Sequence, residues 1–181
     1  WSSVVNVSKS NAFNSNNAQI ITNSNGNAHI VWAEQDNDFS GDNEVYYSRC
    51  TGTTCTNPTN LSGPTNWDCG RFLPNLQDWS SGDPIIGIDE NENLMVLWRA
   101  YEPAEITMAY SAWSSTDSPP TIRTGCLPYN AGVPNHVVGA ARVVGGGTND
   151  FRLVYENLQS SSPARIYYST YNSNSFPLWV S

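Results

Sequence analysis

Lysine is nearly absent from this sequence. Lys9 is the only lysine among 8 basic residues, and the arginines stand singly along the chain. The 16 acidic residues bring the net charge to −8. Because a surface that follows a phosphate backbone needs clustered cations, we expect no nucleic acid as a partner, and no anionic membrane surface either.

Long apolar runs and helical periodicity are missing too. No run reaches the roughly 18 apolar residues of a membrane-spanning helix, so we expect no membrane insertion. No window shows a convincing helical period. Charged residues make up 13% of the chain and aromatic residues 12%. With its abundant Asn, Ser, Thr and Gly, this composition is typical of an exported β-protein and predicts an extracellular or cell-surface location. The chain starts at Trp1, so we expect a processed or excised piece.

Cysteine is scarce as well. The chain has 4 cysteines, an even number that is compatible with two disulfides and an oxidising compartment. His29 and His136 are isolated, so no Cys/His cluster is available to complete a zinc site.

What the sequence does contain is an internal repeat of about 60 residues, present three times. The segments AHIVWAE, LMVLWRA and FRLVYEN correspond to one another. After a polar loop, each is followed by a second strand-like segment: EVYYS, ITMAYS or RIYYS. Each is preceded by an apolar segment and a turn typical of hairpins: NSNGN, DENEN or GGGTND. A short fourth segment closes each copy.

Four short strands repeated at this period predict an all-β fold, a β-propeller with one four-stranded antiparallel blade per repeat. We expect the blades at about 18–62, 83–124 and 136–181, preceded at 1–8 by the last strand of another blade. Three blades are too few for a closed ring, so we expect a larger ring of about six or seven blades. The remaining blades of the same protein, or other copies, would complete it. A β-sandwich is the alternative fold.

The turn after the first EVYYS segment carries a family resemblance. The stretch Ser48 to Cys55 resembles the Asp-box, or BNR repeat, of sialidase-like propellers, with Ser48, Gly52 and Thr54 at matching positions. Cys50 stands at the Asp position and Cys55 at the aromatic position. The third copy keeps the serine and the aromatic end, Ser169 and Phe176, and the second keeps little more than its serine, Ser111.

Sulfur chemistry offers an explanation for these two substitutions. Cysteines that face each other across an antiparallel pair can clasp a tight turn covalently, so we predict a Cys50–Cys55 disulfide. Free thiols or a metal-binding pair are the alternatives. Cys69 and Cys126 fall in equivalent connections of consecutive repeats, and we predict a second disulfide between them.

The resemblance also raises the question of enzymatic activity. It implies an arginine triad for a sugar carboxylate, a Tyr–Glu nucleophile pair and an Asp acid/base at the ring centre. Arg71 and Arg99 are the candidate triad members, although ordinary surface arginines are the alternative. Tyr155 and Glu156 are adjacent, so on a strand they point to opposite faces and cannot form one dyad. Other carboxylates, such as Asp83, Asp89, Glu90 and Glu92, show no marked catalytic pair.

Two further groups are candidate ligand residues. Aromatic residues expected in exposed loops could stack on sugar rings, or pack between blades instead: Trp67, Trp79, Trp113 and Tyr129. An acidic loop could wrap a Ca²⁺ ion, or simply be solvated: Asp36, Asp38, Asp42 and Glu44.

These features favour a binding or scaffold module whose partners are glycans or surface proteins. A sialidase-like glycoside hydrolase, with some catalytic residues outside this chain, is the first alternative. A structural component of a cell-surface assembly is the second.

Overall fold

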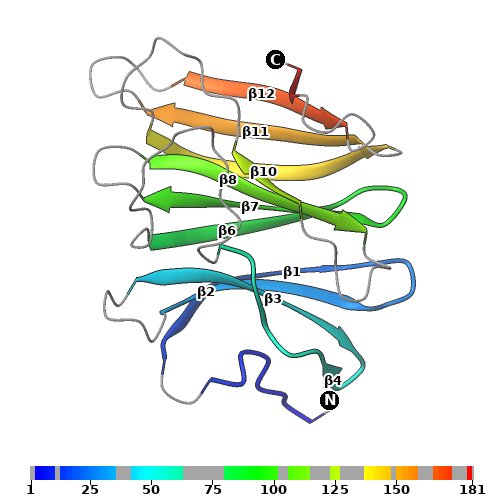
Figure 1. Cartoon of the computed structure of the whole chain (residues 1–181). Coiled ribbons are helices and arrows are strands. Elements are labelled where there is room, and N and C mark those ends of the chain that lie inside the picture. Colours follow the sequence, from blue (N-terminus) through cyan, green and yellow to red (C-terminus); the bar gives the residue numbers. More distant parts are fainter. Residues whose placement is uncertain are drawn as a thin grey trace.

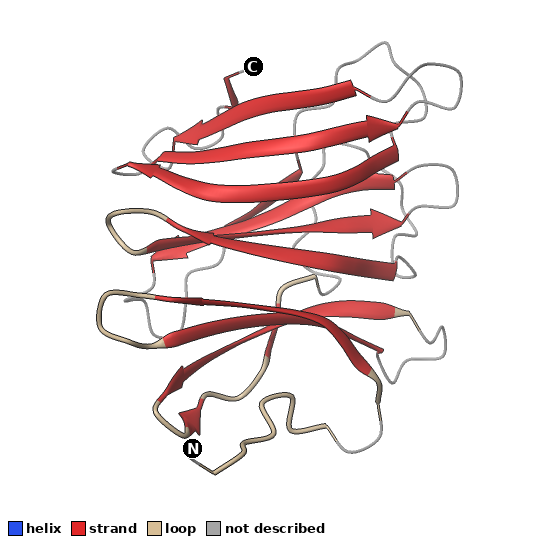
Figure 2. Cartoon of the chain, turned by 180° about the vertical axis from the view of Figure 1, so that it is seen from behind, coloured by secondary structure: helices blue, strands red, loops and turns tan. Residues whose placement is uncertain are grey.

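All regular elements of the structure, a computed structural model, are strands in antiparallel sheets (Figures 1 and 2). The structure describes residues 3–10, 13–35, 42–62, 80–101, 106–114, 123–126, 137–147, 150–158, 165–172 and 179–180. Within these ranges there is no helix, and hence none long and apolar enough to cross a membrane. The predictions of an all-β fold and of antiparallel pairing are confirmed.

The first sheet has the order β1-β2-β3-β4, and β5 pairs with β3 farther along that strand. Its strands are β1 (Ser15–Thr22), β2 (Ala28–Gln35), β3 (Asn43–Thr51), β4 (Thr54–Cys55) and β5 (Thr59–Asn60).

The second and third sheets each have four strands in sequence order. The second contains β6 (Ser80–Ile88), β7 (Asn93–Tyr101), β8 (Ile106–Ser114) and β9 (Arg123–Cys126). The third contains β10 (Val137–Gly147), β11 (Asp150–Leu158), β12 (Arg165–Asn172) and β13 (Trp179–Val180). The strands of each sheet are thus consecutive in the chain.

The sheets are stacked face to face in chain order, with the first at the bottom of Figure 1 and the third at the top. Two apolar cores fill the spaces between them, because alternate residues of each strand point to opposite faces. The core between the first and second sheets contains Val31, Val45, Tyr47, Leu61, Leu94, Val96, Trp98, Ala109 and Trp113. The core between the second and third contains Met95, Leu97, Met108, Tyr110, Ala112, Val143, Phe151, Leu153 and Tyr171.

The N-terminal segment differs from the prediction. A strand was expected over residues 1–8, yet residues 3–10 form none. Asn6 Oδ1 accepts hydrogen bonds from Ser8 Oγ at 3.1 Å and from the backbone N–H of Lys9 at 3.3 Å, and Lys9 has a φ of 56°. Such local side-chain bonds compete with strand pairing, so the segment turns instead of extending.

Candidate binding site at the first-strand bulges

The first strand of every sheet contains a β-bulge. The pairing register shifts between Asn16 and Gln19 in β1 and between Gly82 and Ile85 in β6, and it also shifts in β10. A bulge leaves an extra residue unpaired and re-aims its side chain, and bulges are common next to functional sites.

The bulges of β1 and β6 hold two side chains in a costly backbone conformation. Asn17 has a φ of 52° and Asp83 a φ of 51°, in the left-handed region. Asn and Asp tolerate this region better than other side chains, but glycine adopts it without penalty. A side chain kept where glycine would be easier indicates that the side chain itself has a role. Pro84 follows Asp83 inside the bulge, where its missing N–H costs the sheet no ladder bond.

These two residues and Arg99 form a continuous polar chain, which we call the bulge cluster. Asn17 Nδ2 donates to Asp83 Oδ1 at 2.8 Å, so the contact joins the first sheet to the second. Asp83 Oδ2 lies 3.0 Å from Arg99 Nη1. Arg99 belongs to β7, where it stands opposite Gly82. The cluster is open to solvent, because Asn17 is exposed and the side chains of Asp83 and Arg99 are 40% and 26% exposed.

The bulge cluster lies close to the starts of β1 and β6 and to the ends of β2 and β7. β6 starts at Ser80, after residues 63–79, and β7 ends at Tyr101, before residues 102–105. In the first sheet, β2 ends at Gln35, before residues 36–41. Several candidate residues belong to these connections and lie outside the described residues: Asp36, Asp38, Trp67, Arg71 and Trp79.

In chemical terms, the cluster offers a carboxylate, an amide and a guanidinium within one hydrogen-bonded chain. The carboxylate accepts hydrogen bonds, the guanidinium donates them, and the amide does both. This is a set suited to hydroxyl-rich ligands. It provides one carboxylate, whereas glycoside hydrolysis by the usual mechanism requires two.

Sequence reasoning found Arg99 and Asp83 separately, and missed Asn17. The signal was nevertheless present, because Asn17-Ala18 and Asp83-Pro84 stand at the same distance before the repeated apolar segments. What the sequence did not show is that these two positions meet across a sheet interface.

The prediction that Trp113 lies in an exposed loop is wrong. It belongs to β8, stands opposite Leu94 and is 6% exposed. Its ring meets that of Tyr47 edge-on, with centroids 4.9 Å apart. The strand extends three residues beyond the expected end at Ser111, because β7 begins at Asn93 and β8 pairs with it along its full length. Tyr129, the last of the aromatic candidates, lies outside the described residues.

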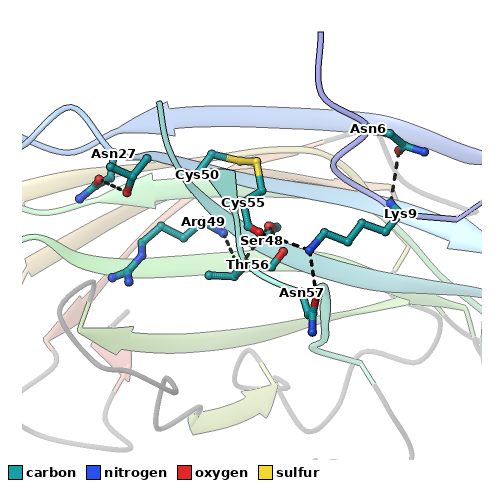
Figure 3. Close-up of a disulfide and its surroundings, with 10 residues drawn as sticks. Asn6, Lys9, Asn27, Ser48, Arg49, Cys50, Cys55, Thr56 and Asn57 are labelled. Atoms are coloured by element: carbon teal, nitrogen blue, oxygen red, sulfur yellow. Dashed lines mark hydrogen bonds between the residues drawn. A yellow bond between two sulfur atoms is a disulfide. The ribbon is translucent and has the colours of Figure 1, made fainter. Parts of the chain in front are cut away.

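The predicted Cys50–Cys55 disulfide is confirmed (Figure 3). The two residues stand opposite each other in the β3–β4 pair, with Cα atoms 4.0 Å apart. Ser48 Oγ donates to the backbone oxygen of Thr56 at 3.0 Å, on the next residue after the bridge. The ammonium of Lys9 donates to the backbone oxygen of Cys55 at 3.3 Å, which ties the N-terminal segment to the same turn.

Other predictions fall partly outside the described residues. Cys69 lies outside them and Cys126 is in β9, so their disulfide stays a prediction. Of the four candidate calcium ligands, only Asp42 and Glu44 are described, and the Glu44 carboxylate accepts a hydrogen bond from Ser62 Oγ. No group of three or more His, Cys, Asp or Glu side chains that could hold a metal gathers among the described residues. The calcium site stays a prediction.

Comparison with known proteins finds similarity in fold but none in sequence. No family model and no curated protein matches the sequence. An endo-arabinase from Bacteroides thetaiotaomicron VPI-5482 superposes on 84% of this chain and 54% of its own, with a TM-score of 0.50 and 13% identity. An ulvan lyase of a new polysaccharide lyase family, bound to -[GlcA(1-4)Rha3S]-, superposes on 90% of this chain and 42% of its own, with a TM-score of 0.53 and 11% identity. The chain thus spans about half the length of these structures, and at this identity the likeness concerns the fold alone.

Proposed function

We propose that the chain forms consecutive blades of a β-propeller in an extracellular protein, and that the bulge cluster is part of a glycan-binding site. The observation that carries this proposal is the Asn17–Asp83–Arg99 chain, in which two residues with left-handed backbone join the first strands of neighbouring sheets through solvent-exposed side chains.

The propeller proposal is supported by equivalent positions in the three sheets. Tyr47, Tyr110 and Tyr168 each precede the repeat serine, and they are 5%, 2% and 58% exposed. The first two face the next sheet in the stack. Tyr168 instead lies on the outer face of the third sheet, beside the exposed side chains of Val154 and Ile166. That face therefore has the composition of an interface, which fits a ring that continues beyond these three blades. The number of blades, and the sialidase-like family suggested by the turn motif, belong to the same proposal.

The glycan proposal is supported by the chemistry of the cluster and by the two similar structures. Fixed donors and acceptors at an exposed edge suit ligands whose surfaces are mostly hydroxyl groups. The names of both similar structures refer to enzymes that act on polysaccharides. A disulfide-clasped turn fits an oxidising location such as the cell exterior.

A panel of soluble polysaccharides would test the binding function. We expect the protein to be retarded in affinity electrophoresis by at least one member of a panel containing arabinan, galactan, ulvan and polygalacturonate. Asp83→Gly removes the side chain and leaves the left-handed backbone unstrained, so it should weaken that binding by about tenfold or more, as for loss of hydrogen bonds to a charged group.

The matched control is Asp150→Asn. Asp150 pairs with Arg152 at 3.5 Å on the third sheet, so this variant also removes a carboxylate from an exposed ion pair, but away from the cluster. It should bind like the parent protein. Absence of binding to every polysaccharide, or equal loss in both variants, would refute a glycan site at Asp83.

A second candidate function is cleavage of a glycan, favoured by the names of the two similar structures. Because the cluster supplies a single carboxylate, cleavage would need a second acidic group from elsewhere in the parent protein. Incubating the same panel with the protein and measuring released reducing ends, or new unsaturated ends by absorbance, distinguishes hydrolase, lyase and binding module. We expect no release from this chain. A structural role in a cell-surface assembly, the third alternative, would leave every polysaccharide unbound.

A further inference from the structure

We infer that the bulge cluster selects neutral saccharides over saccharides that carry carboxylates. This inference rests on the proposed glycan-binding function and specifies its ligand class. It departs from the arginine triad for an acidic sugar that the sialidase resemblance implies.

The first reason is that the arginine of the cluster is already matched by a carboxylate. The guanidinium of Arg99 would be the natural partner of a sugar carboxylate, because its N–H groups bind a carboxylate in a planar fork. Asp83 Oδ2 lies 3.0 Å from Arg99 Nη1, so a carboxylate of the protein already faces this side of the guanidinium. The charges of Asp83 and Arg99 cancel, and Asn17 is neutral.

The second reason is the order in which a ligand meets these groups. The Asp83 side chain is 40% exposed, so the negative member of the pair faces solvent beside Arg99. An incoming carboxylate would therefore approach another carboxylate, and like charges at close range are unfavourable. The net charge of −8 adds a long-range repulsion of the same sign.

The third reason is that Asp83 is held in place. Its backbone is fixed in the β6 bulge at a φ of 51°, and its other carboxylate oxygen accepts the amide N–H of Asn17 at 2.8 Å. A ligand carboxylate that bound Arg99 at Nη1 would compete with this fixed carboxylate for the same N–H group. A neutral sugar avoids this competition, since its hydroxyl groups donate to a carboxylate and accept from an amide without displacing either.

The test compares charge on one saccharide backbone. Polygalacturonate is prepared in native form and in carboxyl-reduced form, which keeps the linkages but converts the acidic sugars to neutral ones. Arabinan and galactan are included as naturally neutral polymers. Affinity electrophoresis or calorimetry at low ionic strength should show the tightest binding with a neutral polymer, and about tenfold or more weaker binding of the native acidic form than of its reduced form.

Asp83→Asn is the decisive variant. Asn tolerates the left-handed conformation and keeps one oxygen, which can accept from Asn17 or from Arg99, so the fold is expected to persist, with circular dichroism and thermal unfolding as the check. The substitution removes the repelling charge and the negative charge that faces Arg99 Nη1. The ratio of acidic to neutral affinity should therefore rise about tenfold. Asp150→Asn, which removes a carboxylate from the third sheet, should leave the ratio unchanged.

Two results overturn the inference, and they are distinguishable. Tighter binding of native polygalacturonate by the parent protein, lost in Arg99→Gln, would refute the neutral-ligand inference while a glycan-binding function stands. Binding of no polymer by any variant would refute the proposed function, and the inference with it.

Discussion

The Nδ1 atom of His29 lies 2.8 Å from the hydroxyl oxygen of Tyr47, and both side chains are buried between the first and second sheets. Their rings are stacked, with centroids 6.0 Å apart. Burial is the main cause that lowers the pKa of His29 to about 4, with the positive charge of Arg49 adding to the effect. Burial likewise raises the pKa of Tyr47 to about 12. At neutral pH the interface therefore contains two neutral, hydrogen-bonded rings.

This arrangement predicts that the protein loses stability in mild acid. The unfolded chain binds a proton at His29 near the ordinary pKa of 6.5, and the folded chain only near 4, so the contribution is complete above pH 6.5 and is lost as the pH falls toward 4. The loss should be on the order of 3 kcal/mol. Urea unfolding of the parent and of His29→Phe across this range measures it. The difference in unfolding free energy between the two proteins separates the contribution of His29 from that of carboxylates, which titrate in the same pH range in both. A difference that does not vary with pH would contradict the prediction.

The Cys50–Cys55 bridge should stabilise the chain modestly. A loop this short gives roughly 2 kcal/mol in the chain-entropy model, because the bridge restricts only a few residues of the unfolded state. The double substitution of both cysteines by alanine should lower the unfolding free energy by that amount. The single substitution Ser48→Ala, which removes the hydroxyl bonded to the Thr56 oxygen, should cost about 1 kcal/mol in either background. No loss in the double variant would mean that the hydrogen bonds alone hold the turn.

The sequence predicts those parts of the fold that depend on local chemistry. The first two hairpin turns, the strand alternation and the Cys50–Cys55 pair are all set by residues close together in the chain, and the structure contains them. Contacts between sheets were harder to foresee. Trp113 is buried because Tyr47, in a different sheet, receives its ring, and the bulge cluster exists because β1 and β6 lie together. The absence of the expected N-terminal strand has a local cause, the hydrogen bonds that the Asn6 side chain accepts from Ser8 and Lys9. Because these residues are close together in the chain, the sequence already contained this signal.

The outer face of the third sheet should make the isolated chain self-associate. Ile166 and Tyr168 are 72% and 58% exposed, although the equivalent residues of the second sheet, Met108 and Tyr110, are buried. Light scattering after gel filtration should show a molecular mass that rises with protein concentration. The double variant Ile166→Lys with Tyr168→Lys should stay monomeric, because charges on this face disfavour its burial.

The free energy of unfolding distinguishes a loss of self-association from a folding defect. Since both side chains are exposed in the monomer, the lysine variant should unfold within about 0.5 kcal/mol of the parent. Tyr110→Lys, at the covered position, should be severely destabilising because it buries a charge in the core. A parent protein that is monomeric at every concentration would count against the interface character of this face.

The glycines at the end of β10 make a final prediction possible. The sequence GGGTND suggested a turn, but Gly145, Gly146 and Gly147 belong to the strand. A Cβ on Gly145 would overlap the backbone oxygen of Ile88 and lie 2.5 Å from the Cα of Asp89, so the absence of a side chain allows the third sheet to approach β6. The obstacle is backbone, which cannot move aside without shifting a sheet.

Gly145→Ala should therefore lower the unfolding free energy by about 1–3 kcal/mol or more, the cost typical of overpacking. The adjacent Gly146 is the matched control, because the atoms nearest to a Cβ there belong to the side chains of Arg152 and Asp150, which can rotate away. Gly146→Ala should cost less than about 1 kcal/mol, since extended backbone gains from the lower entropy of the unfolded alanine. Urea unfolding of the two variants measures the difference. Equal losses of unfolding free energy in the two variants would show that the packing of the second sheet against the third does not depend on this close approach.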